Sequence, residues 1–466
     1  VAAAASAARC SPELRTRAPQ DRDPSRLTAE SAGALLDLLP HTRAFRVTMR
    51  RLRPSMRAAN ASEAIVERII ATHLRPGIAN LAPGTAHWSP PERLVEAALH
   101  GDGGYGDIRG EPALLAALRE EHGREHVMVT PGANQAFVHA LLSTCDVGDE
   151  VLLWRPYYFS HLVALQLLGL VPVFADCDER GLPTPDAVRA SASRPGGRLR
   201  AVVLVSPSNP TGAVCPAELV RELGEACAQA GAWLISDEAY EHFTYGAAEH
   251  ASAAELCAGG GEQLLCLRTF SKSYGLAAWR VGHLSYPHQL HDAMLKVQDT
   301  MPTHACRASQ RLALAALEGL GEAWVREQVA TLEPARAMLW EALAPLRGGG
   351  DALQPAGAFY YFVRLPGCSS RGARVLGEGG EGGEAAEEER SGLLHTSRLT
   401  DCEAEEEAVR RLAAEHELLT LPGSAFGRPG HLRLSYGRLA SAEEAEPIAE
   451  RLLRAAEALR ARWGET

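Results

Sequence analysis

Short apolar runs recur through the middle of the chain, and each ends at a polar residue or a tight turn. The runs are Val127–Thr130, Val151–Trp154, Ala201–Ser206, Trp233–Asp237 and Leu264–Phe270. A continuous apolar run of this length is typical of a strand that is buried on both faces. Sheets of such strands are mostly parallel and bind ligands at the carboxyl ends of their strands. We therefore expect an α/β protein whose site lies where these runs end.

Candidate site residues follow directly after the apolar runs. In chain order they are the turn Gly132-Ala-Asn134, then Tyr158, Asn209, Asp237 with Tyr240, and Lys272. A helix is expected to begin near Ala133, and the free amides at its start suit a phosphate. Taken singly these residues are ambiguous, since Tyr158 fits a core aromatic and Asp237 fits a helix cap. Their shared position at strand ends predicts one site.

Lysine is very rare in this chain. Of the 47 Lys and Arg residues, only Lys272 and Lys296 are lysine. An amine can lose its proton and condense with a carbonyl, which a guanidinium cannot do. Two surface lysines without a role are the alternative interpretation. Lys296 lies in a polar, helical context, whereas Lys272 follows a buried run and precedes small residues, so Lys272 is the candidate catalyst.

The segment around Lys272 carries a resemblance to a known family. Thr269-Phe-Ser-Lys-Ser-Tyr-Gly-Leu-Ala-Ala-Trp-Arg-Val-Gly282 resembles the S-K-x-[FY]-x-x-x-G-x-R-x-G signature of class I/II aminotransferases that depend on pyridoxal phosphate (PLP). Ala278 stands where glycine is usual, and we expect only tighter packing there. The stretches G-T-A-H-W-S-P-P and P-Y-Y-F look closest to plant aromatic and methionine aminotransferases that act on indole-3-pyruvate. The resemblance covers residues 45–466 apart from one insert.

This resemblance implies the fold type I of PLP-dependent transferases, which has a large domain with a mostly parallel seven-stranded sheet and a smaller α/β domain. The implied divisions are a disordered or targeting extension (1–44), an arm with part of the small domain (45–98), the large domain (99–330) and the C-terminal small domain (331–466). The insert, about 368–400, contains a stretch of only Gly, Glu and Ala. Such a composition cannot form a core, so we expect an acidic disordered loop.

The resemblance also implies roles for the cofactor site. Lys272 forms the Schiff base with PLP and moves the substrate's alpha proton, while Asp237 pairs with the pyridine nitrogen. Asn209 and Tyr240 hydrogen-bond the ring hydroxyl. The rest of the implied cofactor set is Gly132, Ala133, Asn134, Tyr158, Thr269 and Arg280, with Tyr105 reaching the phosphate of the neighbouring subunit of a homodimer.

For the substrate, the resemblance implies binding by Gly84, Trp88, Asn209, Tyr360 and Arg433, with Arg433 on the alpha-carboxylate. A planar guanidinium fork suits that group. The candidate pocket residues are aromatic, namely Trp88, Tyr158, Phe359 and Tyr360. A large apolar side chain is therefore expected. Arg307 is the main candidate for binding a side-chain carboxylate of the substrate.

The implied activity is the transfer of an amino group from an L-amino acid, aromatic or methionine favoured, to a 2-oxo acid. An aspartate aminotransferase is an alternative. Another fold type I PLP enzyme, such as a carbon–sulfur lyase or an aminocyclopropane-carboxylate synthase, would share nearly every cofactor residue. A PLP-binding regulator without enzymatic activity is the last alternative.

Composition excludes other classes. The net charge of −11 argues against nucleic acid as a partner. The longest apolar run, Leu162–Ala175, is interrupted and too short to span a bilayer. The ten cysteines lack a C-x-x-C motif and read as free thiols of a reducing compartment, so no metal site is expected. We expect a cytoplasmic protein, or a plastid or mitochondrial one, since residues 1–44 contain Arg and Ser as transit peptides do.

Overall fold

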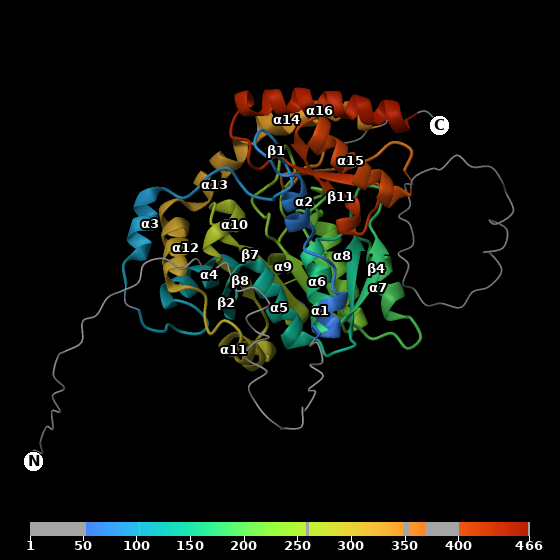
Figure 1. The fold of residues 1–466 in the computed structure, drawn as a ribbon. Coiled ribbons are helices and arrows are strands. Elements are labelled where there is room, and N and C mark those ends of the chain that lie inside the picture. Colours follow the sequence, from blue (N-terminus) through green and yellow to red (C-terminus); the bar gives the residue numbers. More distant parts are fainter. Residues whose placement is uncertain (1–52, 102, 258–260, 348–353, 369–399, 465–466) are drawn as a thin grey trace, which may run out of the picture. The chain divides into compact units, whose positions relative to one another are not determined.

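A seven-stranded sheet forms the centre of the computed structural model, in the order β2–β8–β7–β6–β5–β3–β4 (Figure 1). The strands are β2 (Val127–Thr130), β3 (Glu150–Arg155), β4 (Val171–Asp176), β5 (Leu199–Val205), β6 (Trp233–Asp237), β7 (Leu264–Thr269) and β8 (Gly282–Ser285). β8 is antiparallel to both of its neighbours, and the other adjacent strands pair in parallel. The predicted mostly parallel α/β sheet is confirmed.

The structure describes residues 53–101, 103–257, 261–347, 354–368 and 400–464. All the elements named here belong to one unit, Ser55–Thr466. The extension predicted over 1–44 and residues 369–399 of the predicted insert lie outside the described residues. The predicted domain borders stay a prediction.

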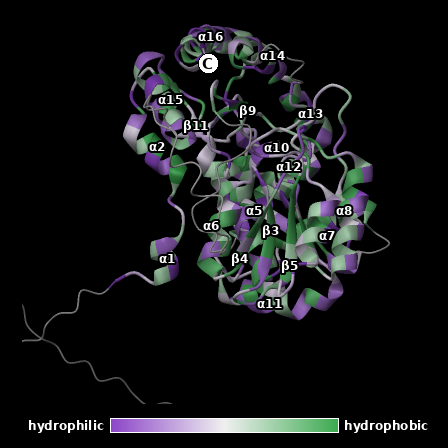
Figure 2. Ribbon diagram, turned by 90° about the vertical axis from the view of Figure 1, so that its right-hand side faces the viewer, coloured by the Kyte–Doolittle hydropathy of each residue, from purple (hydrophilic) through white to green (hydrophobic). Residues whose placement is uncertain are grey.

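Helices cover both faces of the sheet because strand side chains alternate between them. Val151 and Leu153 of β3 pack with Phe137 of α5 (Ala133–Thr144), whereas Leu152 packs with Val220 of α8 (Ala217–Ala230). All of these side chains are buried, which explains why the strand reads as a continuous apolar run. Figure 2 shows β3 and β5 in hydrophobic colours among these helices.

Two groups of helices pack against the central sheet, one group on each face. α5 (Ala133–Thr144), α6 (Phe159–Leu168) and α11 (His291–Thr300) share the core of one face. α7 (Pro185–Ala192), α8 (Ala217–Ala230) and α9 (Ala253–Leu256) share the other. The remaining helices of this region are α3 (Glu92–Leu99), α4 (Pro112–His122), α10 (Phe270–Ser273) and α12 (Arg307–Gly319).

A second group of elements brings distant parts of the chain together. β9 (Tyr360–Arg364), β12 (His431–Ser435) and β11 (Leu421–Pro422) form an antiparallel sheet, and β1 (Ala79–Asn80) pairs in parallel with β10 (Leu418–Leu419). Its helices are α2 (Ile65–His73), α13 (Gly321–Ala330), α14 (Glu333–Ala342), α15 (Asp401–Glu415) and α16 (Ala442–Trp463). None of the described helices is both long and apolar enough to cross a membrane.

The first two described helices are separate elements. α1 (Met56–Asn60) ends before α2 begins, because the backbone of Ala61 is extended. The Ser62 N–H instead donates to Gln166 Oε1 of α6 at 2.8 Å.

Candidate active site

Most of the predicted site residues line one cleft at the carboxyl ends of the central strands. The cleft has a volume of about 910 Å³, including space open to solvent, which is a normal size for a small-molecule site. The predicted residues that line it are Gly84, Ala133, Asn134, Tyr158, Asn209, Asp237, Tyr240, Thr269, Lys272, Arg280, Tyr360 and Arg433. Each strand end that was predicted to contribute to the site therefore contributes at least one lining residue.

Lys272 reaches the cleft from the single-turn helix α10. The hydroxyl of Thr269 caps this helix by accepting a hydrogen bond from the amide two residues on, at 3.2 Å. The Lys272 amine donates to the backbone oxygen of Gly84. Burial and the nearby guanidinium groups of Arg433 and Arg280 lower the pKa of Lys272 to about 8. The amine therefore loses its proton much closer to neutral pH than an ordinary lysine does.

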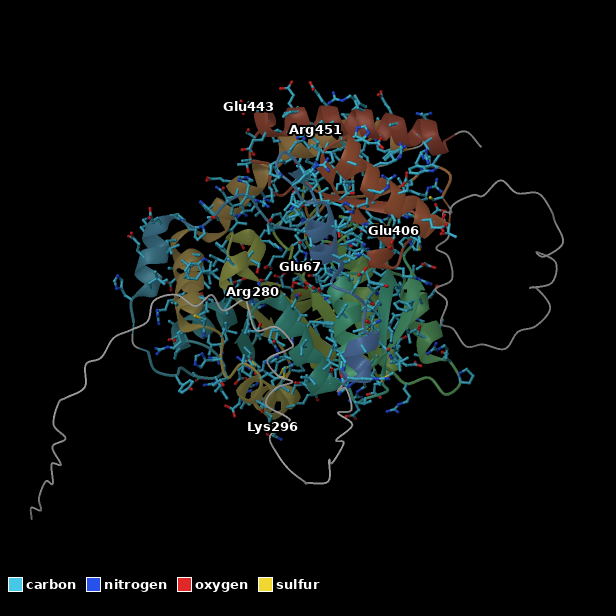
Figure 3. All side chains as sticks on the ribbon, viewed as in Figure 1. Glu67, Arg280, Lys296, Glu406, Glu443 and Arg451 are labelled. Atoms are coloured by element: carbon cyan, nitrogen blue, oxygen red, sulfur yellow. The ribbon has the colours of Figure 1, made fainter. Side chains whose placement is uncertain are left out.

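The second lysine lies elsewhere. Lys296 is exposed on α11, and Figure 3 shows it at an edge of the unit, away from Arg280. Since the whole chain has only these two lysines, Lys272 is the one amine side chain available to the cleft.

Asp237 ends β6 and is buried at the base of the cleft. Its Oδ2 lies 3.0 Å from His161 Nε2, and its Oδ1 accepts a hydrogen bond from the Ala239 N–H at 3.1 Å. The His161 ring packs 4.1 Å from the ring of Phe137. The sequence interpretation missed His161, because a single histidine on a helix carries no local signal and only the fold brings it to the end of β6.

Arg433 lies in the middle of β12 and is almost fully buried. Its guanidinium carbon lies 4.5 Å from the centre of the Tyr360 ring and 5.1 Å from that of Phe426. One guanidinium nitrogen donates to Asn209 Oδ1 at 3.1 Å, and another donates to a backbone oxygen. The Tyr360 hydroxyl is hydrogen-bonded to that of Tyr240. The guanidinium is thus held in place by stacking and by hydrogen bonds.

The start of α5 combines features that suit an anion. Gly132 has a positive φ of 82° directly before the helix, and a Cβ there would come within 2.6 Å of the Arg280 guanidinium. Glycine therefore leaves room for Arg280 beside the free N-terminal amides, a combination that binds phosphate. Ala278 is exposed in a 3-10 turn, so the expected tighter packing at this position is wrong.

Four of the predicted residues do not line the cleft, namely Gly132, Trp88, Tyr105 and the pocket candidate Phe359. Gly132 lies beside the Arg280 guanidinium, and Phe359 is buried against the Tyr240 ring. Trp88 is buried, stacks on Phe243 at 5.9 Å and donates its indole N–H to the Ser273 oxygen at 3.0 Å. It therefore supports the α10 turn from outside the cleft. Tyr105 is 87% exposed, its ring lies edge-on to that of His304 with the centroids 5.9 Å apart, and it does not line the cleft of its own chain.

Apolar side chains complete the lining and were missed by the sequence interpretation. They include Val66 of α2 and Phe159 at the start of α6. Their helical spacing indicates a packed face but not which neighbour it meets, so no local signal marks them.

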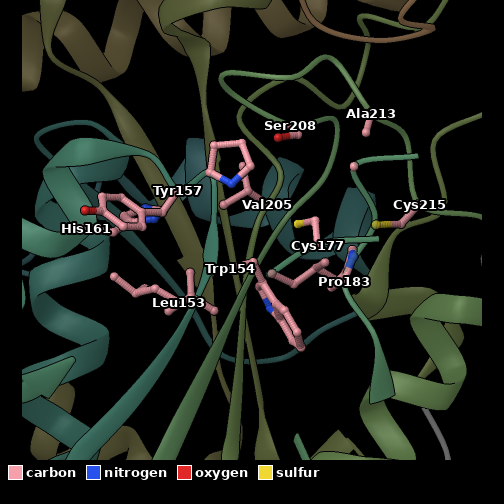
Figure 4. A pocket seen from close by; sticks show the side chains of 14 residues that line it. Leu153, Trp154, Tyr157, His161, Cys177, Pro183, Val205, Ser208, Ala213 and Cys215 are labelled. Atoms are coloured by element: carbon pink, nitrogen blue, oxygen red, sulfur yellow. The ribbon is translucent and has the colours of Figure 1, made fainter. Parts of the chain in front are cut away.

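A second, smaller cavity is lined by Val205 and His161 among other residues (Figure 4). The thiols of Cys177 and Cys215 border it. Burial raises the pKa of each thiol to about 12. Neither thiol is a nucleophile at neutral pH, and this cavity adds no reactive group to the site.

The arrangement matches a known family. Residues 78–452, well over half of the chain, match the family model for aminotransferase class I and II. This chain belongs to the class I and II aminotransferases. Among curated relatives, an aromatic aminotransferase of Arabidopsis thaliana is 34% identical over 380 residues, covering 78% of this chain and 86% of the relative. An aspartate aminotransferase of Geobacillus stearothermophilus is 30% identical over 395 residues, covering 82% and 92%.

Solved aminotransferase structures share the fold. The aspartate aminotransferase of Thermus thermophilus with maleate is 28% identical, with a TM-score of 0.71 over 87% of this chain and 100% of the other. An aromatic aminotransferase of Pyrococcus horikoshii is 26% identical, with a TM-score of 0.68 over 85% and 99%. The predicted fold type I is confirmed.

As a class I/II aminotransferase, this enzyme uses PLP and acts on an amino acid and a 2-oxo acid. The chemistry of the cleft fits PLP. The Gly132–Arg280 cradle suits its phosphate, the His161-bound carboxylate of Asp237 suits its ring nitrogen, and the amine of Lys272 suits its aldehyde.

Proposed function

We propose that this aminotransferase prefers amino donors with large apolar side chains, namely phenylalanine, tyrosine, tryptophan and methionine, over aspartate. The supporting observation is that the part of the cleft lining without a proposed cofactor role includes apolar and aromatic side chains, namely those of Val66, Pro83, Phe159 and Tyr360. Burying a large apolar side chain there is worth about 1.5–3 kcal/mol. A side-chain carboxylate would lose its hydration against such a wall.

The cations of the described cleft also support this preference. They are Lys272, Arg280 and Arg433, and each has a proposed partner other than a substrate side chain. Arg307 does not line the cleft. It pairs with Glu111 at 2.5 Å and donates to the Gly104 oxygen at 3.0 Å.

We propose the following roles for the residues, and the geometry of the cleft supports them. When bound, PLP withdraws electrons from the substrate's alpha carbon. Asp237, held by His161, pairs with the ring nitrogen and keeps it protonated. Arg433 binds the alpha-carboxylate with its planar fork. The neutral amine of Lys272 accepts the alpha proton, which its lowered pKa favours.

The remaining proposed cofactor contacts surround these groups. Tyr158 stacks on the ring, and Asn209 and Tyr240 hydrogen-bond its hydroxyl. Gly132, Ala133, Asn134 and Thr269 join Arg280 around the phosphate. For the substrate, we propose backbone contact at Gly84 and side-chain contacts with Asn209 and Tyr360. Trp88 would act only indirectly, through the α10 turn.

We further propose a homodimer with shared active sites. Tyr105 is a large aromatic side chain that is 87% exposed in the single chain. Leu99 and Met301 are likewise more than half exposed. Exposed apolar groups of this kind favour burial against a second copy of the chain, where Tyr105 would reach the neighbour's phosphate.

A donor panel tests the substrate preference. PLP-loaded protein is assayed with phenylalanine, tyrosine, tryptophan, methionine and aspartate against pyruvate, 2-oxoglutarate and phenylpyruvate. We expect kcat/KM for the apolar donors to exceed that for aspartate about tenfold or more, given the apolar burial energy.

The same panel decides between the alternatives. If aspartate is the best donor and Arg307→Ala removes that preference alone, the enzyme is an aspartate aminotransferase. Ammonia release without formation of the amino form of the cofactor would indicate a carbon–sulfur lyase or a related fold type I enzyme.

A further inference from the structure

Glu405 of α15 is a buried carboxylate that accepts hydrogen bonds from the backbone amides of Ser424 and Gly430 and from the Ser424 side chain. Its side chain is 0% exposed. The Ser424 N–H donates to both carboxylate oxygens at 3.1 Å, and the Gly430 N–H donates to one of them at 2.9 Å. In the described part of the chain no basic side chain forms an ion pair with Glu405. The backbone amides thus replace the water that burial removes.

These two amides lie at the ends of one segment, residues 424–430, which we call the Glu405 turn. The turn leads directly into β12, so Gly430 is three residues before Arg433. Within the turn, Phe426 packs its ring 5.1 Å from the Arg433 guanidinium. The Phe426 oxygen accepts a hydrogen bond from the Tyr157 N–H at 3.0 Å. The turn therefore packs against the Arg433 guanidinium through Phe426 and is hydrogen-bonded to the sheet region through Tyr157.

The turn has a second, weaker anchor. Arg428 pairs with Asp176 at the end of β4 at 2.9 Å, but that carboxylate is 52% exposed. Exposed ion pairs contribute little, whereas buried hydrogen bonds to a charged group contribute more. Glu405 therefore constrains the turn more strongly than this ion pair does.

We propose that Glu405 is a positioning residue for substrate binding. By holding both ends of its turn, it sets the place of Phe426 and Arg433 and thereby the affinity of the enzyme for the substrate's carboxylate. This inference rests on the proposed role of Arg433.

The arrangement predicts a pH dependence. Burial raises the pKa of Glu405 to about 7, against the opposing effect of the Ser424 and Gly430 hydrogen bonds. Below that pH the carboxyl group gains a proton and becomes a weaker acceptor for the two amides, so affinity for carboxylate ligands falls. The charged and titratable groups around it are Asp401, Cys368, Cys402, Arg428 and His431.

Among these neighbours, two pKa values lie far from neutrality. Burial raises the pKa of Cys368 to about 12 and lowers that of His431 to about 4. Burial also raises the pKa of Cys402. These three groups therefore stay neutral around pH 7. Lys272 of the cleft has a pKa of about 8, so the comparison with Glu405→Gln is what assigns a change in affinity near pH 7 to Glu405.

The experiment uses the PLP-loaded enzyme and 3-phenylpropanoate, an unreactive aromatic carboxylate, as the probe. Glu405→Gln keeps the side-chain volume but removes the charge. We expect its inhibition constant for 3-phenylpropanoate and its KM for phenylalanine to rise about tenfold, as for a lost charge-assisted hydrogen bond. The affinity for PLP and the half-reaction with phenylethylamine, which lacks a carboxylate, should be unchanged.

The neighbouring Glu406 provides the matched control. It is exposed on the same helix, and Figure 3 places it on α15. Glu406→Gln should leave all of these values unchanged. In the wild-type enzyme the inhibition constant should rise as the pH falls through about 7, and in Glu405→Gln this dependence should vanish.

The outcomes separate the inference from the function on which it rests. If Arg433→Lys leaves the inhibition constant unchanged, Arg433 does not bind the carboxylate and both proposals fail. If Arg433→Lys raises it but Glu405→Gln does not, only the role of Glu405 is wrong. If Glu405→Gln weakens 3-phenylpropanoate binding and slows the phenylethylamine half-reaction by the same factor, Glu405 has only a structural role. Should Glu405→Gln fail to fold, a flat wild-type profile between pH 6 and 8 would still overturn the inference.

Discussion

At the scale of single residues, the site depends on buried charges that have fixed partners. Asp237 is held by His161, and Arg433 is held by Asn209 and two aromatic rings. Burying a charge without a partner costs several kcal/mol, so these contacts offset part of the cost of burying both groups and fix their orientation. Lys272 is different, because burial and two nearby arginines favour its neutral form.

Replacing Lys272 by alanine tests its proposed bond to the cofactor. Borohydride reduction should attach PLP covalently to the wild-type chain, and mass spectrometry of peptides should place it at Lys272. Lys272→Ala should still bind PLP but no longer be labelled. Lys296→Ala is the control and should be labelled like the wild type. Labelling that survives in Lys272→Ala, or that maps to Lys296, would exclude the assignment.

Replacing Asp237 by asparagine tests its proposed pairing with the ring nitrogen. The variant keeps the size of the side chain but loses the negative charge, so turnover should fall roughly 10²-fold or more, as for other removed charge-stabilising groups. Far-ultraviolet circular dichroism should remain that of the wild type. Near-normal turnover would mean that Asp237 is only structural.

At the scale of elements, the connection from β2 to α5 shows how local backbone conformation builds a binding site. α5 begins at Ala133, as the sequence predicts, and Gly132 gives the turn its positive φ. The side of Gly132 where a Cβ would lie is occupied by Arg280, whose own φ of 51° is unusual for a residue other than glycine. The Gly132 turn and the Arg280 guanidinium are therefore complementary in shape.

Gly132→Ala should consequently weaken PLP binding. The added Cβ would displace the Arg280 guanidinium, and we expect the dissociation constant for PLP to rise about tenfold or more, which corresponds to about 1.4 kcal/mol. Fluorescence titration of the apoenzyme with PLP measures this. Gly123→Ala is the matched control, because Gly123 also has a positive φ of 58° but nothing lies within 4 Å of its Cβ position. The control should lose stability without losing PLP affinity, and equal losses in both variants would contradict the fit.

At the scale of the whole molecule, the cleft is assembled from segments that are far apart in the sequence. The pairing of β1 with β10 joins residues near position 80 to residues near 419. α2 contributes Val66 to the cleft, β12 contributes Arg433, and the strand ends of the central sheet contribute the proposed cofactor contacts. Tyr105, in contrast, is exposed and does not line this cleft.

Mixing two inactive variants tests whether sites are shared between subunits. In a two-fold dimer, a heterodimer of Tyr105→Ala and Lys272→Ala would contain one intact site, so a statistical mixture should recover about a quarter of wild-type activity. A mixture of Lys272→Ala and Asp237→Asn should recover none, because both residues serve the same subunit's site. Absence of recovery in verified Tyr105→Ala/Lys272→Ala heterodimers would contradict a shared site.

The sequence by itself determined five strands of the central sheet and the order of its site residues, whereas β4 and β8 were not predicted. A strand buried on both faces is apolar along its length, so β3 and β5 are recognisable without any knowledge of their neighbours. The polar residues after such strands meet because parallel strands end at one edge. The signature around Lys272 is also local, as is the glycine turn before α5.

Only the tertiary structure decided which helix residues meet those strand ends. His161 reaches Asp237, Val66 enters the cleft and Trp88 packs outside it through contacts between distant segments. Helical periodicity indicates that a face is buried but not against what. The Glu405 turn is the clearest case, because a glutamate in a strongly charged helix reads as solvent-exposed until the fold places two backbone amides against it.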